Sequence, residues 1–263
     1  MQTTTHDPRT VILAMTSPTR RVAWIAIATA FLAWASPATA QDHRWFISVN
    51  GGSQATSTDF ADNVVFTEFI EEGDFDAAYG IDSGVIFDIG GGVRLPFDLG
   101  IGLGFSRFDK SNDASVNARI PHPFFFDRDR AIAGSAPSLT RRENSVHVQV
   151  RWFVPTPEPV ELSVFGGPTF SSVTQGLVTA VEFSQTYPFD VASFTAAASG
   201  TQTESAVGYN VGADVGFFFS RYVGIGALVR FSRASLDLVS EDSGLVSVDT
   251  GGLHAGGGLR LRF

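Results

Sequence analysis

The chain has 263 residues, of which 44% are hydrophobic and 17% are charged, so it is long enough for one barrel-sized domain and its composition is not that of a disordered protein. It contains no cysteine, which excludes disulfides, thiolate metal sites and cysteine nucleophiles. The formal net charge of −9 at pH 7 argues against nucleic acid as a partner.

Residues 20–40 form the first predicted element. They begin with two arginines, continue with an apolar run of about fourteen residues and end in Ala-Thr-Ala, which is typical of a secretory signal peptide. The apolar run is too short to span a bilayer stably, so an uncleaved anchor is the less favoured interpretation. We therefore predict a signal peptide over residues 1–40, cleaved before Gln41, and a mature domain over residues 41–263 with 15 basic and 26 acidic side chains.

Apolar and polar residues alternate with a period of two throughout the mature chain, and no window keeps helical apolar spacing over three turns. Each alternating segment predicts a β-strand with one apolar and one polar face. There are eight such segments, at about residues 43–54, 84–95, 99–108, 144–154, 160–172, 205–219, 223–238 and 251–263. Short turns at residues 96–98, 155–159 and 220–222 alternate with long links at about residues 55–83, 109–143, 173–204 and 239–249.

Charged residues are confined to one face of these segments. The apolar faces carry no Asp, Glu, Lys or Arg at membrane depth, where a base at the midplane costs up to ~2–4 kcal/mol. The charges on the opposite, inward face are Asp88, Arg94, Arg151, Glu161, Asp214, Arg230, Arg260 and Arg262. Alternation alone does not separate a membrane barrel from a soluble sandwich or lipocalin-like barrel. The alternation of short and long connections favours the membrane barrel, because outer-membrane barrels have short periplasmic turns and long external loops.

The last segment, Gly251–Phe263, alternates apolar and polar residues and ends on an aromatic side chain. It resembles the closing strand of a bacterial outer-membrane β-barrel. The whole mature chain resembles the small eight-stranded barrels typified by the transmembrane domain of outer membrane protein A and its opacity-type, porin-like relatives. The resemblance implies an all-β, eight-stranded antiparallel up-and-down transmembrane β-barrel in the outer membrane of a Gram-negative cell.

The same resemblance implies partners. Phe263, together with Leu261 and Leu259, would carry the signal that the barrel-assembly machinery recognises. The other expected partners are outer-membrane lipids and lipopolysaccharide, and we expect a monomer. In this family the last strand closes the barrel against the first, so we expect it to meet the chain near Trp45 and Ile47.

The inward charges have two interpretations. Arg151 and Glu161 fall within diagonal reach across one hairpin, as do Asp214 and Arg230 across another. Eight strands leave an interior just wide enough for side chains, so such pairs predict a plug, as the family resemblance also implies. A narrow ion or solute channel lined by the same residues is the alternative. It draws support from the terminal bases at positions 260 and 262, for which few acidic partners are evident.

We predict that the chain is not an enzyme and uses no cofactor or metal. His147 and His254 face inward, but neither lies in the His-x-Ser order of lipid A deacylases, and no Asp-x-His pair of the omptin type occurs. A lipid-modifying enzyme is the least favoured alternative. The glycines at every second residue over 100–104 and 224–226 predict room for bulky inward neighbours, since they open no helix and so do not fit a phosphate-binding loop.

Two of the links have unusual compositions. The first contains eight acids and no base; Asp74 and Asp76 could coordinate calcium, but a solvated acidic loop is favoured. The second contains three consecutive phenylalanines at residues 124–126, for which we predict packing over the barrel mouth or membership of the outer aromatic girdle. Contact with a partner or a membrane surface is the less favoured interpretation. The predicted function is a structural or surface-interaction role through four external loops, which would meet any extracellular partner.

Overall fold

The computed structural model describes residues 44–55, 58–239 and 245–263, all within one compact unit, Asp42–Phe263. The signal peptide predicted over residues 1–40 lies outside these ranges and stays a prediction. Within the described ranges, no helix has both the length and the apolarity needed to cross a membrane.

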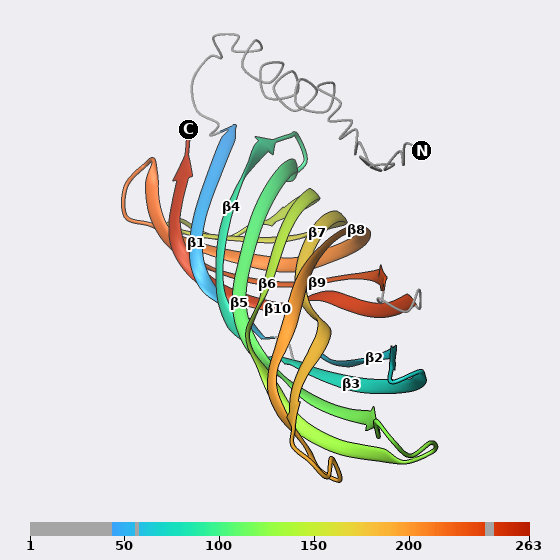
Figure 1. Ribbon diagram of the computed structural model, residues 1–263. Coiled ribbons are helices and arrows are strands. Elements are labelled where there is room, and N and C mark those ends of the chain that lie inside the picture. The colour runs from blue at the N-terminus through green and yellow to red at the C-terminus, as the bar shows by residue number, and fades with distance from the viewer. Residues whose placement is uncertain (1–43, 56–57, 240–244) are drawn as a thin grey trace, which may run out of the picture. The chain divides into compact units, whose positions relative to one another are not determined.

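Ten strands make up a single antiparallel sheet in the described residues. They are β1 (Trp45–Ala55), β2 (Thr58–Glu68), β3 (Glu71–Ile81), β4 (Gly84–Arg94), β5 (Leu99–Pro121), β6 (Asp129–Val154), β7 (Val160–Gln185), β8 (Ala192–Phe218), β9 (Val223–Val239) and β10 (Leu245–Arg262). Eight of them close into a ring, in the order β5-β4-β1-β10-β9-β8-β7-β6, because β6 pairs back onto β5 (Figure 1). The predicted all-β, eight-stranded antiparallel barrel is confirmed.

The last strand closes this ring against the first. In the register of β1 and β10, Ile47 lies opposite Leu261. The backbone N–H of Trp45 donates to the carbonyl of Phe263 at 2.7 Å, and the N–H of Phe263 donates back to Trp45 at 3.0 Å. The predicted seam between the chain's two ends is therefore confirmed.

An apolar belt covers the outside of the ring. On β5, for example, the exposed side chains from Leu99 to Phe105 are all apolar, and the positions between them are glycines facing inward. Aromatic side chains mark both edges of the belt, as in outer-membrane barrels. We call the edge near the chain's carboxyl terminus the terminal end of the barrel, and the opposite edge the distal end. The aromatic residues at the terminal end are Trp45, Trp152, Phe217, Tyr222 and Phe263. Those at the distal end are Phe87, Phe105, Phe170, Tyr209 and Phe231.

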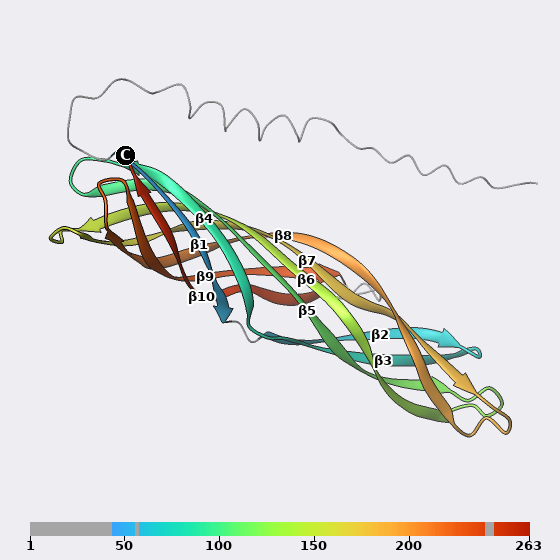
Figure 2. The ribbon, with the colours of Figure 1, turned by 90° about the vertical axis from the view of Figure 1, so that its left-hand side faces the viewer.

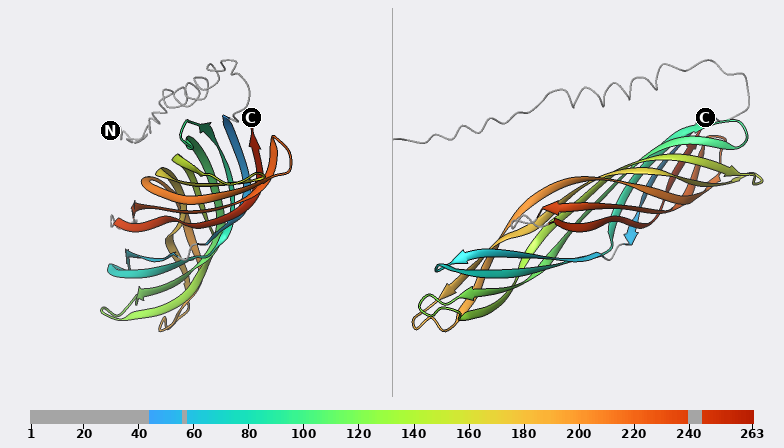
Figure 3. Two further views of the ribbon diagram at one scale, coloured as in Figure 1. Left: turned by 180° about the vertical axis from the view of Figure 1, so that it is seen from behind. Right: turned by 90° about the vertical axis from the view of Figure 1, so that its right-hand side faces the viewer.

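In the described residues, strands fill most of the four long links, whose conformation the sequence left open. The link over residues 55–83 holds the β2–β3 hairpin, and β3 pairs with β5 from Asp74↔Arg119 to Tyr79↔Ala114. Strands β5–β6 and β7–β8 run on as long hairpins, and β9–β10 as a shorter one (Figures 2 and 3). The alternation continues through these segments with the apolar side chains now facing inward, so the strands continue past the belt.

The distal hairpins enclose their own hydrophobic core. The four strands β2, β3, β5 and β6 pack through their inner face on the β7–β8 hairpin, since the buried cluster takes Phe75 and Val116 from one side and Leu177 and Val178 from the other. The Tyr79 hydroxyl accepts a hydrogen bond from the Val178 N–H at 2.8 Å across this interface. Burial raises the pKa of Tyr79 to about 12, so its hydroxyl stays neutral at any physiological pH.

Candidate functional site in the barrel interior

Buried ion pairs cross the middle of the barrel. Arg230, only 1% exposed, lies with Nη1 2.8 Å from Asp88 Oδ2. Arg260 donates to both carboxylate oxygens of Asp214, at 2.9 and 2.7 Å. The Asn50 side chain joins the two pairs, since it accepts from Arg260 at 2.6 Å and donates to Asp88 at 3.2 Å. Every charge in this group has an opposite charge, which buried ions require.

These partners differ from the predicted ones. The prediction paired Asp214 with Arg230 across the β8–β9 hairpin, but Asp214 binds Arg260 from β10. The reason is that the intervening strand, β9, has a glycine and therefore no side chain at this position. A Cβ placed on Gly226 would lie 3.0 Å from Arg260 Nε, so the Arg260 side chain passes over the bare backbone of β9 to reach β8. The glycine interpretation is confirmed here, as it is at Gly100, which makes room for Phe153.

A second layer of ion pairs lies at the carboxyl-terminal end of the lumen. Glu161 lies 3.4 Å from Arg94 and 3.8 Å from Arg262, rather than pairing with Arg151 as predicted. Arg262 also lies 3.4 Å from Glu158 in the adjacent turn. The terminal bases therefore have acidic partners after all, and the expected shortage of acids at positions 260 and 262 is wrong. The guanidinium groups of Arg94 and Arg262 also lie 4.2 and 4.0 Å from the centres of aromatic rings.

Arg151 is the exception in the interior. Its guanidinium lies between the rings of Phe46 and Phe165, at 4.9 and 4.7 Å from their centres, and donates to the Ser163 hydroxyl at 3.0 Å. Among the described residues no ion pair joins it to a carboxylate within 4.0 Å. Cation–π contacts, this hydroxyl and the Gln149 side-chain oxygen, which accepts from Arg151 Nη2 at 3.4 Å, therefore take the place of a counter-ion.

The two inward histidines are parts of hydrogen-bonded layers. His147, 0% exposed, lies 2.9 Å from the Ser106 hydroxyl and 2.8 Å from the Thr169 hydroxyl. His254 Nδ1 lies 3.1 Å from Arg230 Nη2 and must accept that bond, because a guanidinium can only donate. The Ser106–His147 pair has the spacing of a nucleophile and base, but a threonine hydroxyl stands where a triad has an orienting acid.

A third charged cluster lies at the distal end of the lumen. The buried carboxylate of Glu143 accepts from Arg141 Nε and Thr250 Oγ1, each at 2.6 Å, and from Gln54 Nε2 at 3.3 Å. It thereby ties β6 to β1 and β10. The inward position of both charged residues was missed because they fell within a predicted link. Extending the alternation of β6 backwards from Ser145 would have placed them on the inward face.

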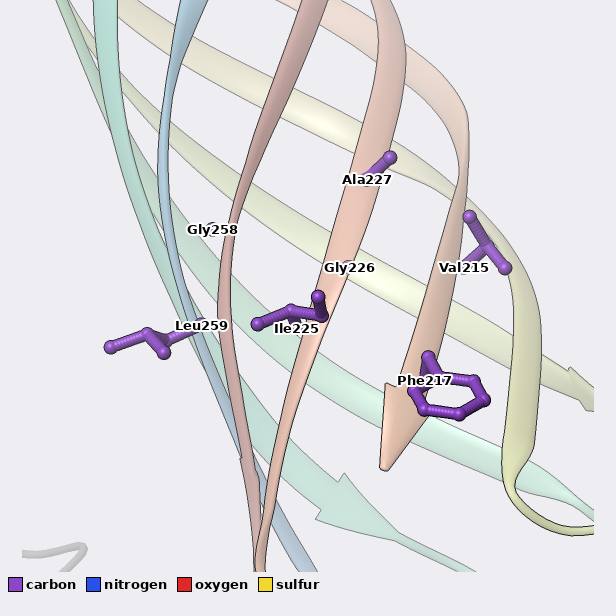
Figure 4. Close-up of a pocket in the computed structure, with 7 residues that line it drawn as sticks. All are labelled: Val215, Phe217, Ile225, Gly226, Ala227, Gly258 and Leu259. Atoms are coloured by element: carbon purple, nitrogen blue, oxygen red, sulfur yellow. The ribbon is translucent and has the colours of Figure 1, made fainter. Parts of the chain in front are cut away.

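Hollows lie outside the lumen. One of about 550 Å³ is on the outer wall, where Phe217, Ile225 and Leu259 lie around the half-buried Gly226 and Gly258 (Figure 4). A smaller one, of about 70 Å³, lies between β2 and the β7–β8 hairpin. The larger hollow lies on the outer face of the apolar belt, so it is not an entrance to the barrel interior.

The acidic first link is built into the distal sheet. Asp74 forms a bidentate ion pair with Arg119 on β5, with hydrogen bonds of 2.6 and 2.8 Å, and accepts a further hydrogen bond from Asn63. The Arg119 guanidinium holds the pKa of Asp74 below its ordinary value. In the ranges that the structure describes, no three His, Asp or Glu side chains are grouped as a metal site.

The three phenylalanines at 124–126 lie in the β5–β6 turn at the distal tip, where they are 66%, 55% and 73% exposed. The prediction that they cover the barrel mouth or join the girdle is wrong. The reason is the length of the hairpin: from Phe105 at the edge of the belt to Pro121, the strand rises about 50 Å.

No family model matches the sequence, and no curated protein matches it. Among solved structures, Neisserial surface protein A is 13% identical over 83% of this chain and 97% of its own, with a TM-score of 0.40. The outer membrane protease OmpT from Escherichia coli is 10% identical over 86% and 99%, with a TM-score of 0.48. The outer membrane protein OprG from Pseudomonas aeruginosa is 9% identical over 85% and 97%, with a TM-score of 0.41.

These similarities carry no information on activity. The fold class rests on the closed ring and its apolar belt, and it is that of an eight-stranded outer-membrane β-barrel.

Proposed function

We propose that the chain is an outer-membrane protein with a sealed barrel, whose role is structural or surface-interacting and not enzymatic. The short turns face the periplasm and the distal sheet faces the outside of the cell. The network of buried ion pairs across the lumen carries this proposal. Asp88–Arg230 and Asp214–Arg260 join strands that are not neighbours in the ring. Arg141 and Glu143 both belong to β6, but Glu143 accepts hydrogen bonds from Gln54 on β1 and Thr250 on β10. A conducting path would have to break these contacts.

Breaking a buried pair is unfavourable. Removal of one partner leaves an uncompensated charge and costs about 3–5 kcal/mol. In planar bilayers we therefore expect the purified mature chain to show no unitary conductance steps. Steps that change in size when Asp214 or Arg230 is neutralised would contradict the sealed barrel.

A channel for small anions is the second candidate, and Arg151 is the observation that favours it. This buried base lacks a carboxylate partner in the described residues and leaves the lumen with surplus positive charge. If the chain does conduct, anion selectivity that disappears in Arg151→Gln would identify this route.

We also propose two partners that the barrel needs in its membrane. Arg107, Arg142 and Arg233 stand exposed beyond the distal girdle, at the level of lipid headgroup phosphates and lipopolysaccharide. At the terminal end, Phe263 with Leu261 and Leu259 would be read by the barrel-assembly machinery. Deletion of Phe263 is then expected to lower the fraction of heat-modifiable barrel in membranes, whereas Phe97→Ser in a periplasmic turn should leave it unchanged.

A further inference from the structure

The distal tips of three hairpins form one exposed apolar patch. It consists of Ile70, Phe124, Phe125, Phe126, Tyr187 and Val191, which we call the tip patch; all are more than half exposed. The β2–β3 and β5–β6 turns are joined by a hydrogen bond from the Asp127 N–H to Glu71 Oε1 at 2.8 Å. The β5–β6 and β7–β8 turns are joined by the Arg128–Asp190 pair at 3.0 Å. Figure 2 shows these tips together, away from the carboxyl end.

The tip patch is held in place by a buried base. Arg130, 5% exposed, donates to the carbonyl of Pro121 in its own turn at 2.7 Å and to the carbonyl of Phe189 in the neighbouring turn at 3.0 Å. The Phe124 ring meets Phe189 edge to face, with 5.5 Å between ring centres. Aromatic side chains on a fixed backbone lose little entropy on binding, which makes them effective contact residues.

Stability of the fold does not account for the tip patch. The distal core is already filled by inward side chains of the same strands, whereas these six point into solvent. Since they lie about 50 Å of strand beyond the belt, the lipid of the chain's own membrane does not cover them either. Exposed apolar patches of this kind mark interaction sites.

Charge defines the partner. Acids alternate with the apolar residues in the sequence: Glu71 and Glu72 follow Ile70, Asp127 follows Phe126, and Asp190 precedes Val191. Over residues 68–74, 119–130 and 185–191 there are seven acids and three bases. Insertion into a lipid bilayer would force these carboxylates into the headgroup layer, and an anionic surface would repel them.

We propose that the tip patch binds a protein partner through an apolar surface flanked by lysine or arginine side chains. This inference rests on the proposed function, because it places the distal tips outside the cell. It names the binding surface and the chemistry of the partner. The apolar contacts supply affinity, while the acids select a basic rim and speed association.

The test measures binding of two probe peptides to the full mature chain in lipid nanodiscs. One is an amphipathic leucine–lysine peptide, and the other is its leucine–glutamate counterpart. We expect the lysine peptide to bind, and Phe124→Ser with Phe126→Ser to weaken its binding about tenfold or more. Phe97→Ser, which removes an exposed ring from the opposite end, should leave binding unchanged.

A second pair of variants separates the apolar from the charged contribution. Asp127→Asn with Asp129→Asn should weaken binding several-fold and reduce its dependence on salt, because these acids adjoin the tip patch. Asp59→Asn with Glu204→Gln removes two exposed acids elsewhere and should have no such effect. Heat-modifiable migration on gels confirms that each variant is folded.

Three results would overturn the inference. They are equal binding of the two peptides, unchanged binding in the phenylalanine variants, and displacement of the lysine peptide by phosphatidylcholine vesicles, which would assign the tip patch to a membrane. The conductance measurement remains independent: a silent barrel with a non-binding tip disproves this inference alone, and a conducting barrel disproves the sealed lumen alone.

Discussion

The barrel region inside the apolar belt, here the belt half, and the distal hairpins beyond it, the distal half, share several strands. The inward and outward faces of these strands have opposite polarity in the two halves. On β5 the outward side chains are apolar from Leu99 to Phe105 and polar from Arg107 to Arg119. The inward ones change from glycine and serine to the apolar residues between Ala114 and Ile120. A strand can therefore pass from lipid into water only if its faces exchange roles at the boundary. The two halves should respond differently to the same kind of mutation.

The largest effect is expected from an unpaired charge in the belt half. Asp214→Asn leaves Arg260 buried without its carboxylate and should lower the free energy of unfolding by about 3–5 kcal/mol. Asp214→Leu combined with Arg260→Met should recover much of this loss. Urea unfolding in lipid vesicles measures both, with Glu204→Gln, an exposed acid on the same strand, as the control. A loss under about 1 kcal/mol for Asp214→Asn would mean that the pair does not hold the lumen together.

The distal half should instead fail through a cavity. Phe75→Ala empties a buried site in the distal core and should destabilise that core by about 3–5 kcal/mol. We expect faster amide hydrogen exchange over residues 58–81 while the barrel stays heat-modifiable. Simultaneous loss of the barrel would show that the two halves unfold as one unit.

A base on the outer face should distinguish the two media. Ile101→Arg places a charge in the belt and should cost up to ~2–4 kcal/mol. Ser115→Arg, on the same face of the same strand but in the distal half, should cost almost nothing because it stays in water. Unfolding free energies of the two variants give the comparison directly. Equal costs would place residue 115 in lipid.

The smallest effect concerns pH and only the distal half. Arg119 lowers the pKa of Asp74 in the folded state, so the pair contributes stability above the ordinary value of 3.8 and loses it as pH falls through the lower folded pKa. Exchange protection of β3 should be constant from neutral pH to about pH 4 and decrease below it. Asp74→Asn should abolish this step. The same decrease in the variant would assign it to another group.

Much of the fold could be predicted because strand alternation is a local property. Each side chain faces the opposite way from its neighbours, so the parity of the apolar residues is enough to separate the two faces of each strand. The connection lengths then indicated that the apolar face meets lipid. The turns at residues 96–98, 155–159 and 220–222 followed from the gaps between alternating segments. The seam between Trp45 and Phe263 followed from the resemblance to closed barrels.

The distal sheet was missed because its alternation is inverted and interrupted. On β6 the inward positions shift from Ala136 to Leu139, out of step with a period of two. The structure has a bulge there, where Ser138 adopts a positive φ of 60° and its N–H donates to Asp113 at 2.9 Å. A bulge adds one residue to a strand and so breaks the pattern by which strands are recognised.

The sequence by itself determined the inward position of the eight predicted charges, because this depends on parity along each strand. The fold class and the seam between the ends followed from the connection lengths and from the resemblance to outer-membrane barrels. Only the tertiary structure decided which charges meet. Arg260 reaches Asp214 over Gly226, and Arg230 reaches Asp88, because closure of the ring brings β10 and β4 toward strands remote in sequence. It also decided that three turns converge in the tip patch, since their separation depends on strand length and on the packing of the distal hairpins.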